Sequence, residues 1–498
     1  MMAAVTEQAR ADQEKEKEKE KEKPAAPPER ESVTERTALI AGDQVSYRAV
    51  ASTTTLRGDD GQPRASVFSV AYTRTGVDDP AGRPLTFVFN GGPGSSSTWL
   101  HLGLVGPRRV DLPDGPTAPQ APYRVIDNDA SLLDASDLVF IDPVSTGYSR
   151  AAEGQDAKQF HGLHEDLESV GEFIRLYASR TGRWASPKFL VGESYGTTRA
   201  AGLARHLAER HGMHVSGVGL ISAVLMFQSI RTDPGNDLAH VLSLPTYAAT
   251  AWYHRRLDER FGDLRALTDE VEEFALGDYA SVLLRGSRAA QAERRSVLDR
   301  LATYSGLSPG FLEACNLRVA PHRFFKELLR SERRTVGRLD TRFTGIDPDA
   351  AGESPQYDPS YMVIQAPFTA AVNAHLRDEL GFESDLPYEV LRAESVRPWN
   401  YGEDGSNHYV DVASTLRTAM SWNRGLRVLL ASGYFDMATP FAAAEWTFDH
   451  MGLDPSLAGN VRATRYEAGH MMYINPPSRD RLARELRALV TGAAPADV

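Results

Sequence analysis

Short apolar runs alternate with amphipathic stretches in the first half of the chain. Residues 67–73 and 85–89 have the composition of strands, and the glycines, aspartates and proline between them predict a hairpin. Further strands are predicted at 138–141, 188–191 and 215–221, with helices at 164–180 and from 197 to about 210. This alternation predicts an α/β fold with a mostly parallel sheet and helices on both faces.

The alternation stops at about Ala223 and resumes near Thr415. Between them, residues 264–284 and 289–304 have helical patterns without intervening strands. Strands return at 427–431 and 463–466, and a helix is expected at 478–490. The sequence therefore predicts a core formed by residues 36–222 and 416–498, interrupted by a helical cap at 223–415.

The N-terminal residues have a different composition. Residues 14–23 alternate Glu and Lys without an apolar face, and prolines follow at positions 24, 27 and 28. Such a segment buries too little surface to offset its ordering entropy, so residues 1–35 are expected to form a disordered charged tail. They also lack the apolar stretch of a secretory signal, and no run approaches a membrane span, so we expect a cytoplasmic protein.

Charge and cysteine content restrict the function further. The formal net charge of −12 disfavours binding to nucleic acid or to an anionic membrane, so a peptide or a small molecule is the expected substrate. Cys315 is the single cysteine, which excludes an intramolecular disulfide, and we expect a buried thiol there. No motif indicates a metal or a cofactor, and Asp347-x-Asp349 lacks the other positions of a calcium loop.

The segment Phe189-Leu-Val-Gly-Glu-Ser-Tyr-Gly196 points to a nucleophilic serine. A predicted strand leads into Gly-x-Ser-x-Gly and then into a helix, which is the context of a nucleophile elbow. The small residues Gly192 and Gly196 allow the strained turn that would present the Ser194 hydroxyl above the sheet edge. Gly-x-Ser-x-Gly often occurs by chance, so the interpretation depends on this context and on finding a base and an acid.

A serine hydroxyl needs a base and an orienting acid, and both occur in the order expected for an α/β-hydrolase. Asp436 follows the strand predicted at 427–431, and His470 follows the strand at 463–466. Taken alone, Asp436 could cap a helix that starts after Pro440, and His470 could be one of 13 ordinary histidines. With Ser194 they form a candidate catalytic triad.

Acyl transfer also needs hydrogen-bond donors for an oxyanion. Asn90-Gly-Gly-Pro-Gly94 follows the strand predicted at 85–89, where such a loop is expected. A phosphate-binding loop is the alternative, but the Lys-Ser/Thr pair is missing and Pro93 lacks an amide hydrogen.

Together, the Asn-Gly-Gly-Pro-Gly loop, the Gly-Glu-Ser-Tyr elbow and the Gly-His-Met segment at 469–471 resemble the serine carboxypeptidase family, within the α/β-hydrolase superfamily. Asp142-Pro-Val-Ser-Thr-Gly-Tyr-Ser149 also looks like that family's loop ahead of the elbow. The resemblance implies that Gly92 and Tyr195 supply the oxyanion-hole amides. It further implies that Asn90 and Glu193 bind the terminal carboxylate of the substrate, and that the insertion shapes the side-chain pocket. From the residues alone, Glu193 could instead pack beneath the elbow.

The chain departs from the family's eukaryotic members at three positions. Val88 stands where they usually have Trp, Ser95 where they have Cys, and Leu104 where a second Glu contacts the substrate carboxylate. The absence of disulfides fits a cytoplasmic, bacterial-like member.

The resemblance implies a serine-type carboxypeptidase in which an acyl-enzyme forms on Ser194, with His470 as general base and Asp436 as its orienting acid. An esterase or an acyltransferase with the same triad is the alternative, because the fold does not fix the acceptor. A binding protein without catalysis is disfavoured by the intact triad.

Overall fold

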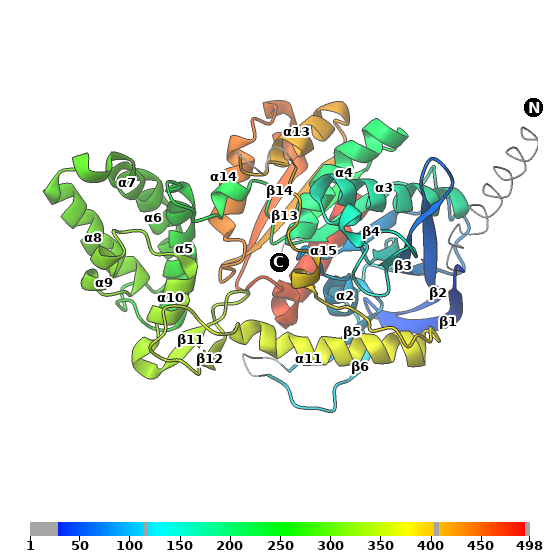
Figure 1. Ribbon diagram of the computed structural model, residues 1–498, viewed down its shortest axis with the longest axis horizontal. Helices are drawn as coiled ribbons and strands as arrows, with labels where there is room; N and C mark the ends of the chain where they lie inside the picture. Colours follow the sequence, from blue (N-terminus) through cyan, green and yellow to red (C-terminus); the bar gives the residue numbers. More distant parts are fainter. Residues whose placement is uncertain (1–27, 114, 116–117, 403–407, 494–498) are drawn as a thin grey trace, which may run out of the picture.

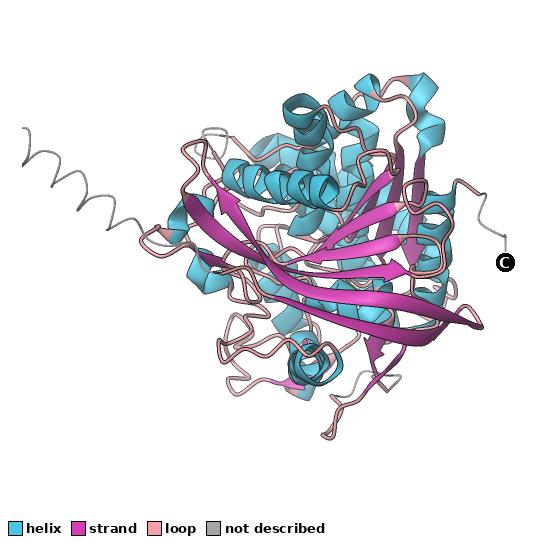
Figure 2. Cartoon of the chain, turned by 90° about the vertical axis from the view of Figure 1, so that its right-hand side faces the viewer, coloured by secondary structure: helices cyan, strands magenta, loops and turns pink. Residues whose placement is uncertain are grey.

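The computed structural model describes residues 28–113, 115, 118–402 and 408–493. At the centre of these residues lies a sheet of ten strands in the order β1-β2-β3-β7-β4-β9-β10-β13-β14, with β8 paired to β3 (Figure 2). The strands are β1 (Glu31–Ile40), β2 (Asp43–Arg57), β3 (Pro63–Arg74), β4 (Leu85–Phe89), β7 (Asp137–Ile141), β8 (Arg150–Ala151), β9 (Lys188–Glu193), β10 (Gly217–Ile221), β13 (Arg427–Gly433) and β14 (Val461–Tyr466).

The sheet begins earlier in the chain than the composition predicts. β1 pairs antiparallel with β2 from Glu31↔Ser52 onward, so the predicted tail at 1–35 is wrong for residues 31–35. Most side chains of β1 are at least partly exposed, and backbone hydrogen bonds rather than an apolar face hold the strand in place. The Glu-Lys stretch at 14–23 lies outside the described residues.

The hairpin predicted for residues 67–89 is also wrong. β3 and β4 do not pair with each other, because β7 lies between them. Phe140 of β7 is opposite Val70 of β3 in an antiparallel ladder and opposite Val88 of β4 in a parallel one. The glycines and aspartates do form a turn there, but a turn signal alone does not identify the strand's partner.

From β7 to β14 every neighbouring pair of strands is parallel. The carboxyl ends of these strands therefore lie at one edge of the sheet. In this register Phe89 is opposite Gly192, and Glu193 is opposite Ile221. The loops that follow β4, β9 and β10 consequently start beside one another, which is where ligands bind in parallel sheets.

Helices cover both faces of the sheet, which confirms the predicted α/β class. On one face, α3 (Leu163–Arg180), α4 (Tyr195–His211) and α13 (Ala413–Trp422) enclose an apolar core that includes Phe173, Leu190 and Leu220. On the other face, α11 (Pro359–Ala374), α15 (Pro476–Thr491) and the short segments α2 (Thr98–Leu100) and η1 (His101–Val105) enclose a second core. α14 (Phe441–His450) follows β13. None of the described helices combines the length and apolar character needed to cross a membrane.

The segment between β10 and β13 contains a separate helical body, drawn in green beside the core in Figure 1. Its helices are α5 (Leu238–Tyr253), α6 (Leu264–Phe274), η4 (Ala275–Tyr279), α7 (Ala280–Arg285), α8 (Gln291–Ser305), α9 (Pro309–Ala314) and α10 (Pro321–Glu327), and a small hairpin follows, β11 (Arg334–Val336) with β12 (Thr344–Ile346). This body has its own apolar core, in which the rings of Tyr247 and Phe324 stack with centroids 3.9 Å apart. As expected, Cys315 is buried in it.

The part of the predicted cap that follows the small hairpin packs with the core. α11 runs back from the cap along the core (Figure 1), and Phe368 and Val372 are buried in the second core. α13 begins at Ala413 and packs on α4, so the predicted boundary at 415/416 falls within a core helix. The apolar residues of α11 and α13 cover the faces of the sheet, and these two helices therefore pack with the core.

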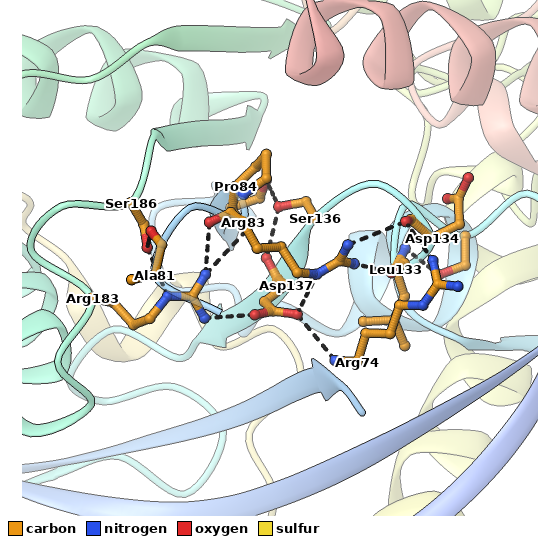
Figure 3. A network of polar contacts seen from close by, with 12 residues as sticks. Arg74, Ala81, Arg83, Pro84, Leu133, Asp134, Ser136, Asp137, Arg183 and Ser186 are labelled. Atoms are coloured by element: carbon orange, nitrogen blue, oxygen red, sulfur yellow. Dashed lines mark hydrogen bonds and ion pairs between the residues drawn. The ribbon is translucent and has the colours of Figure 1, made fainter. Parts of the chain in front are cut away.

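A buried ionic cluster fixes the opposite end of β7 (Figure 3). The Asp137 carboxylate accepts hydrogen bonds from Arg83 Nε at 2.8 Å and from Arg183 Nη1 at 2.6 Å. It also accepts one from the Arg74 amide at 3.0 Å. Asp137 is 1% exposed, so its charge needs these partners. The cluster ties β3, β7 and the segment that precedes β9 together, far from the carboxyl edge.

Candidate active site

Ser194 lies in the turn between β9 and α4, in a conformation that requires small neighbours. Its φ and ψ angles are 60° and −129°, outside the usual regions for an L-residue. A Cβ on Gly192 would lie 2.1 Å from the carbonyl oxygen of Gly196, so glycine is required there. The Ser194 amide donates to the Ile221 carbonyl at 3.0 Å, and its side chain is only partly buried. The turn therefore presents the hydroxyl at the carboxyl edge of the sheet.

Asp436 and His470 form a buried hydrogen-bonded pair. The distance between His470 Nδ1 and Asp436 Oδ2 is 2.7 Å, and the two residues are 4% and 0% exposed. Because a carboxylate only accepts hydrogen bonds, Nδ1 must carry the proton. Nε2 of the neutral imidazole is then free to accept one, as a general base requires.

The loop after β13 holds the Asp436 carboxylate in place. Its Oδ1 accepts the amides of Ala438 at 2.8 Å and Thr439 at 3.0 Å, and its Oδ2 accepts the Thr439 hydroxyl at 2.7 Å. These donors fix the orientation of the carboxylate toward His470. Thr439 is a supporting residue that the sequence prediction missed.

The electrostatics of His470 combine opposing effects. Burial lowers the pKa of the imidazole, whereas the charge and hydrogen bond of Asp436, together with the charge of Glu193, raise it. The net result is a pKa above the ordinary value. Asp436 therefore stabilises the protonated form of the imidazole.

The residue after β10 connects the elbow to the histidine loop. Ser222 donates from its hydroxyl to the His470 carbonyl at 2.7 Å, next to the Ile221 carbonyl that accepts the Ser194 amide. Ser194 also lines a pocket of about 1010 Å³ together with Met437, Ala438 and Thr439 of the acid loop. The structure thus brings the three predicted triad residues to one edge of the sheet.

The predicted oxyanion loop packs directly on the elbow. A Cβ on Gly91 would lie 2.5 Å from the Tyr195 amide nitrogen, so the two backbones are in close contact. Gly92 and Tyr195 line the pocket beside Ser194. In the described part of the chain, neither of their amides donates to a protein acceptor. Both amides are therefore available to a ligand oxygen.

Part of the chain is similar to a known protein family. Residues 64–259 match a protein family described as serine carboxypeptidase. The match covers less than half of the chain. No curated protein matches the chain significantly.

Among solved structures, the prohormone-processing carboxypeptidase of Saccharomyces cerevisiae is 17% identical, with a TM-score of 0.52 over 90% of this chain and 91% of that one. It shows that the chain has the α/β-hydrolase fold, as predicted. A proline iminopeptidase from Mycobacterium smegmatis is 13% identical, with a TM-score of 0.37 over 89% of this chain and 100% of that one.

Asn90 and Glu193, to which the serine carboxypeptidase resemblance assigns carboxylate binding, lie together beside the elbow. Asn90 Nδ2 donates to Glu193 Oε1 at 3.1 Å, and the two residues are 1% and 3% exposed. Neither is among the described residues that line the pocket. Burial raises the pKa of Glu193 to about 7, although His470, the Tyr473 hydroxyl and Asn90 oppose this shift. Leu104, at the family's second acidic position, is buried in the apolar core.

A strap from the cap, residues 337–342, joins the acid and histidine loops. The Met437 amide donates to the Arg338 carbonyl at 3.1 Å, and the His470 amide donates to the Leu339 carbonyl at 2.6 Å. The Gly469 amide donates to Asp340 Oδ2 at 3.1 Å. No motif marks this segment in the sequence, which is why the prediction missed it.

We expect Asp340 to position His470. Asp340 is buried, and its carboxylate also holds the Arg342 guanidinium, with Nη2 at 2.7 Å from Oδ2. Asp340→Ala should lower kcat by roughly 10-fold to 100-fold, because the Gly469 amide loses its acceptor and the histidine loop is released.

The matched control is Arg342→Gln. It also breaks the ion pair between Asp340 and Arg342, but it keeps the hydrogen bond from the Gly469 amide to Asp340. Both variants should lose thermal stability, whereas only Asp340→Ala should lose most of its turnover. Equal turnover in the two variants would show that Asp340 contributes to stability alone.

Proposed function

We propose that the chain is a serine carboxypeptidase that releases the C-terminal residue of a peptide. The observation that supports this most strongly is the buried Asp436–His470 pair beside Ser194, which stands at a strained elbow and lines an open pocket. The family assignment of residues 64–259 supports the same reaction class.

In the proposed reaction, His470 Nε2 takes the proton of the Ser194 hydroxyl as its oxygen attacks the scissile carbonyl. The free amides of Gly92 and Tyr195 stabilise the negative charge that develops on the carbonyl oxygen. His470 then protonates the leaving nitrogen, and an acyl-enzyme remains on Ser194. Water, activated by the same imidazole, hydrolyses this ester and restores the serine.

Hydrolysis or transfer of simple acyl esters is the second candidate. Leu104 lies in the apolar core, and this leaves the family's acidic set for the substrate carboxylate incomplete. The test is to incubate the protein with blocked dipeptides, their C-terminal amides and acyl esters, and to identify the products. Release of a free amino acid from the blocked dipeptides is expected, and ester cleavage without any peptide cleavage would contradict the proposal.

The pH profile should show whether Glu193 adjoins the substrate. Its pKa of about 7 means that the carboxyl is largely protonated below pH 7 and can donate to a substrate carboxylate. Above pH 7 it is charged and repels that group. We expect kcat/KM for a blocked dipeptide to fall as the pH rises through about 7, and Glu193→Gln to remove this fall. The low-pH limb, set by His470, should remain.

A stability measurement provides the control for this prediction. The ordinary pKa of 4.5 in the unfolded chain lies below the folded value of about 7, so burial of Glu193 costs stability progressively between these pH values. Glu193→Gln should therefore gain stability relative to the wild type above pH 7 in denaturant titrations. If the stability difference appears but the kinetic profile does not change, Glu193 is buried without contacting the substrate.

A further inference from the structure

The charged residues around the pocket are mainly cationic. Arg231, Arg338 and Arg397 line it, together with one described carboxylate, Glu394. Arg397 is paired with Glu394 at 3.0 Å. Within the described residues, Arg231 and Arg338 have no carboxylate within ion-pair distance. The described lining of the pocket therefore has an excess of positive charge, which favours an anionic group on the substrate.

The backbone of Arg338 is held between the two loops that carry the acid and the histidine. Its carbonyl accepts the Met437 amide at 3.1 Å, one residue from Asp436, and the next carbonyl along the strap accepts the His470 amide. On its other side, the Arg338 amide donates to Asp358 Oδ1 at 3.0 Å. The side chain is exposed at the pocket. The positive charge of Arg338 acts on His470 and lowers the pKa of the imidazole, against the raising effect of Asp436.

The reaction fixes where the substrate carboxylate must lie. His470 delivers its proton to the leaving nitrogen, and in a C-terminal amino acid the carboxylate is separated from that nitrogen by one carbon. The carboxylate must therefore lie on the histidine side of Ser194.

Arg338 is on this side of the pocket. The other two arginines lie on the Tyr195 side. The guanidinium carbon of Arg231 is 6.0 Å from the centre of the Phe227 ring, which packs on the Tyr401 ring. Tyr401 and Arg397 are each two residues from Trp399, whose ring centre is 5.4 Å from that of Tyr195.

We propose that Arg338 binds the C-terminal carboxylate of the substrate, a role that the family's acidic residues fill in other members. The inference rests on the proposed carboxypeptidase function and names the residue that provides its exopeptidase specificity. A guanidinium forms two parallel hydrogen bonds with a carboxylate and stays charged at any working pH. Recognition by Arg338 consequently needs no shared proton. It adds to the contact expected from Glu193 below pH 7 and persists above pH 7, where the charged Glu193 carboxylate opposes binding.

The test compares two substrates that differ only in the carboxylate: a blocked dipeptide with a free C-terminus and the same dipeptide as its C-terminal amide. The quantity measured is the ratio of the two kcat/KM values at pH 7.5. In Arg338→Gln this ratio should fall roughly 10-fold to 100-fold, the usual loss for a hydrogen bond between charged groups. Arg338→Lys should retain an intermediate ratio, because it keeps the charge without the paired donors.

Arg397→Gln is the matched control, since it removes a pocket arginine on the Tyr195 side and should leave the ratio near the wild-type value. An unchanged ratio in Arg338→Gln, or an equal fall in Arg397→Gln, would overturn the inference and leave carboxypeptidase activity standing. A wild-type protein that cleaves an acyl ester but no free-carboxylate dipeptide would overturn the proposed function, and the inference with it. Thermal unfolding of each variant establishes that it is folded.

Discussion

Ser194→Ala is expected to lower kcat by roughly 10⁴-fold or more with little change in stability. The substitution removes the hydroxyl that would form the acyl-enzyme. A water molecule would then have to attack the substrate directly, and this is a less effective nucleophile than the positioned serine. The backbone contacts of the elbow should persist, because the Ser194 amide and carbonyl form them without its side chain. The measurement is steady-state turnover of a blocked dipeptide, with thermal unfolding in parallel. Near-wild-type turnover in the purified variant would falsify the assignment of Ser194.

Covalent labelling provides an independent control for that prediction. A serine-directed phosphonylating reagent should modify Ser194 in the wild type and nothing in Ser194→Ala. Cys315 is the other candidate nucleophile by chemistry, but its thiol is buried in the cap. Labelling should therefore be unaffected in Cys315→Ala, and mass spectrometry of peptides from the modified protein shows which side chain carries the adduct.

Asp436→Asn should lower kcat by about 10⁴-fold, which is the loss seen when the orienting acid of other triads is replaced by its amide. The amide oxygen of Asn can still accept the amides of Ala438 and Thr439, which bind Oδ1 in the wild type. Its NH₂ group would then face His470 Nδ1, whose N–H donates a hydrogen bond to Oδ2 in the wild type. This reverses the tautomer of the imidazole and removes the free lone pair from Nε2.

Thr439→Val is the matched control for this variant. It removes the hydroxyl that donates to Asp436 Oδ2 at 2.7 Å but leaves the carboxylate and the histidine tautomer in place. We expect a loss of about 10-fold or less. Comparable losses in Thr439→Val and Asp436→Asn would mean that the tautomer is not the cause.

The sequence located Ser194, Asp436 and His470 because each follows a strand with a recognisable local pattern. The turn at Ser194 depends on glycines two residues away on either side, which are visible without knowledge of the fold. Their assignment to catalysis remains a prediction. The α/β class was predictable for the same reason, since the alternation of strands and helices is a local property.

What the sequence could not provide depends on contacts between distant segments. The placement of β7 between β3 and β4 is set by pairing across more than 50 residues, and no turn signal encodes it. Arg338 and Asp340 lie in the insertion, about 100 and about 130 residues before the loops that they contact. Their residue types are common in exposed loops, so only the folded chain reveals that they border the site.

The strap also bears on how the cap could be exchanged between related enzymes. The cap looks like a module because its helices enclose a core of their own. The strap nevertheless provides hydrogen-bond acceptors, at residues 338–340, to the backbones of both the acid loop and the histidine loop. A chimera that replaced the whole insertion would remove these acceptors along with the helices. The exchangeable unit is therefore the helical body from α5 to α10, and the strap has to be inherited with the acid and histidine loops that it supports.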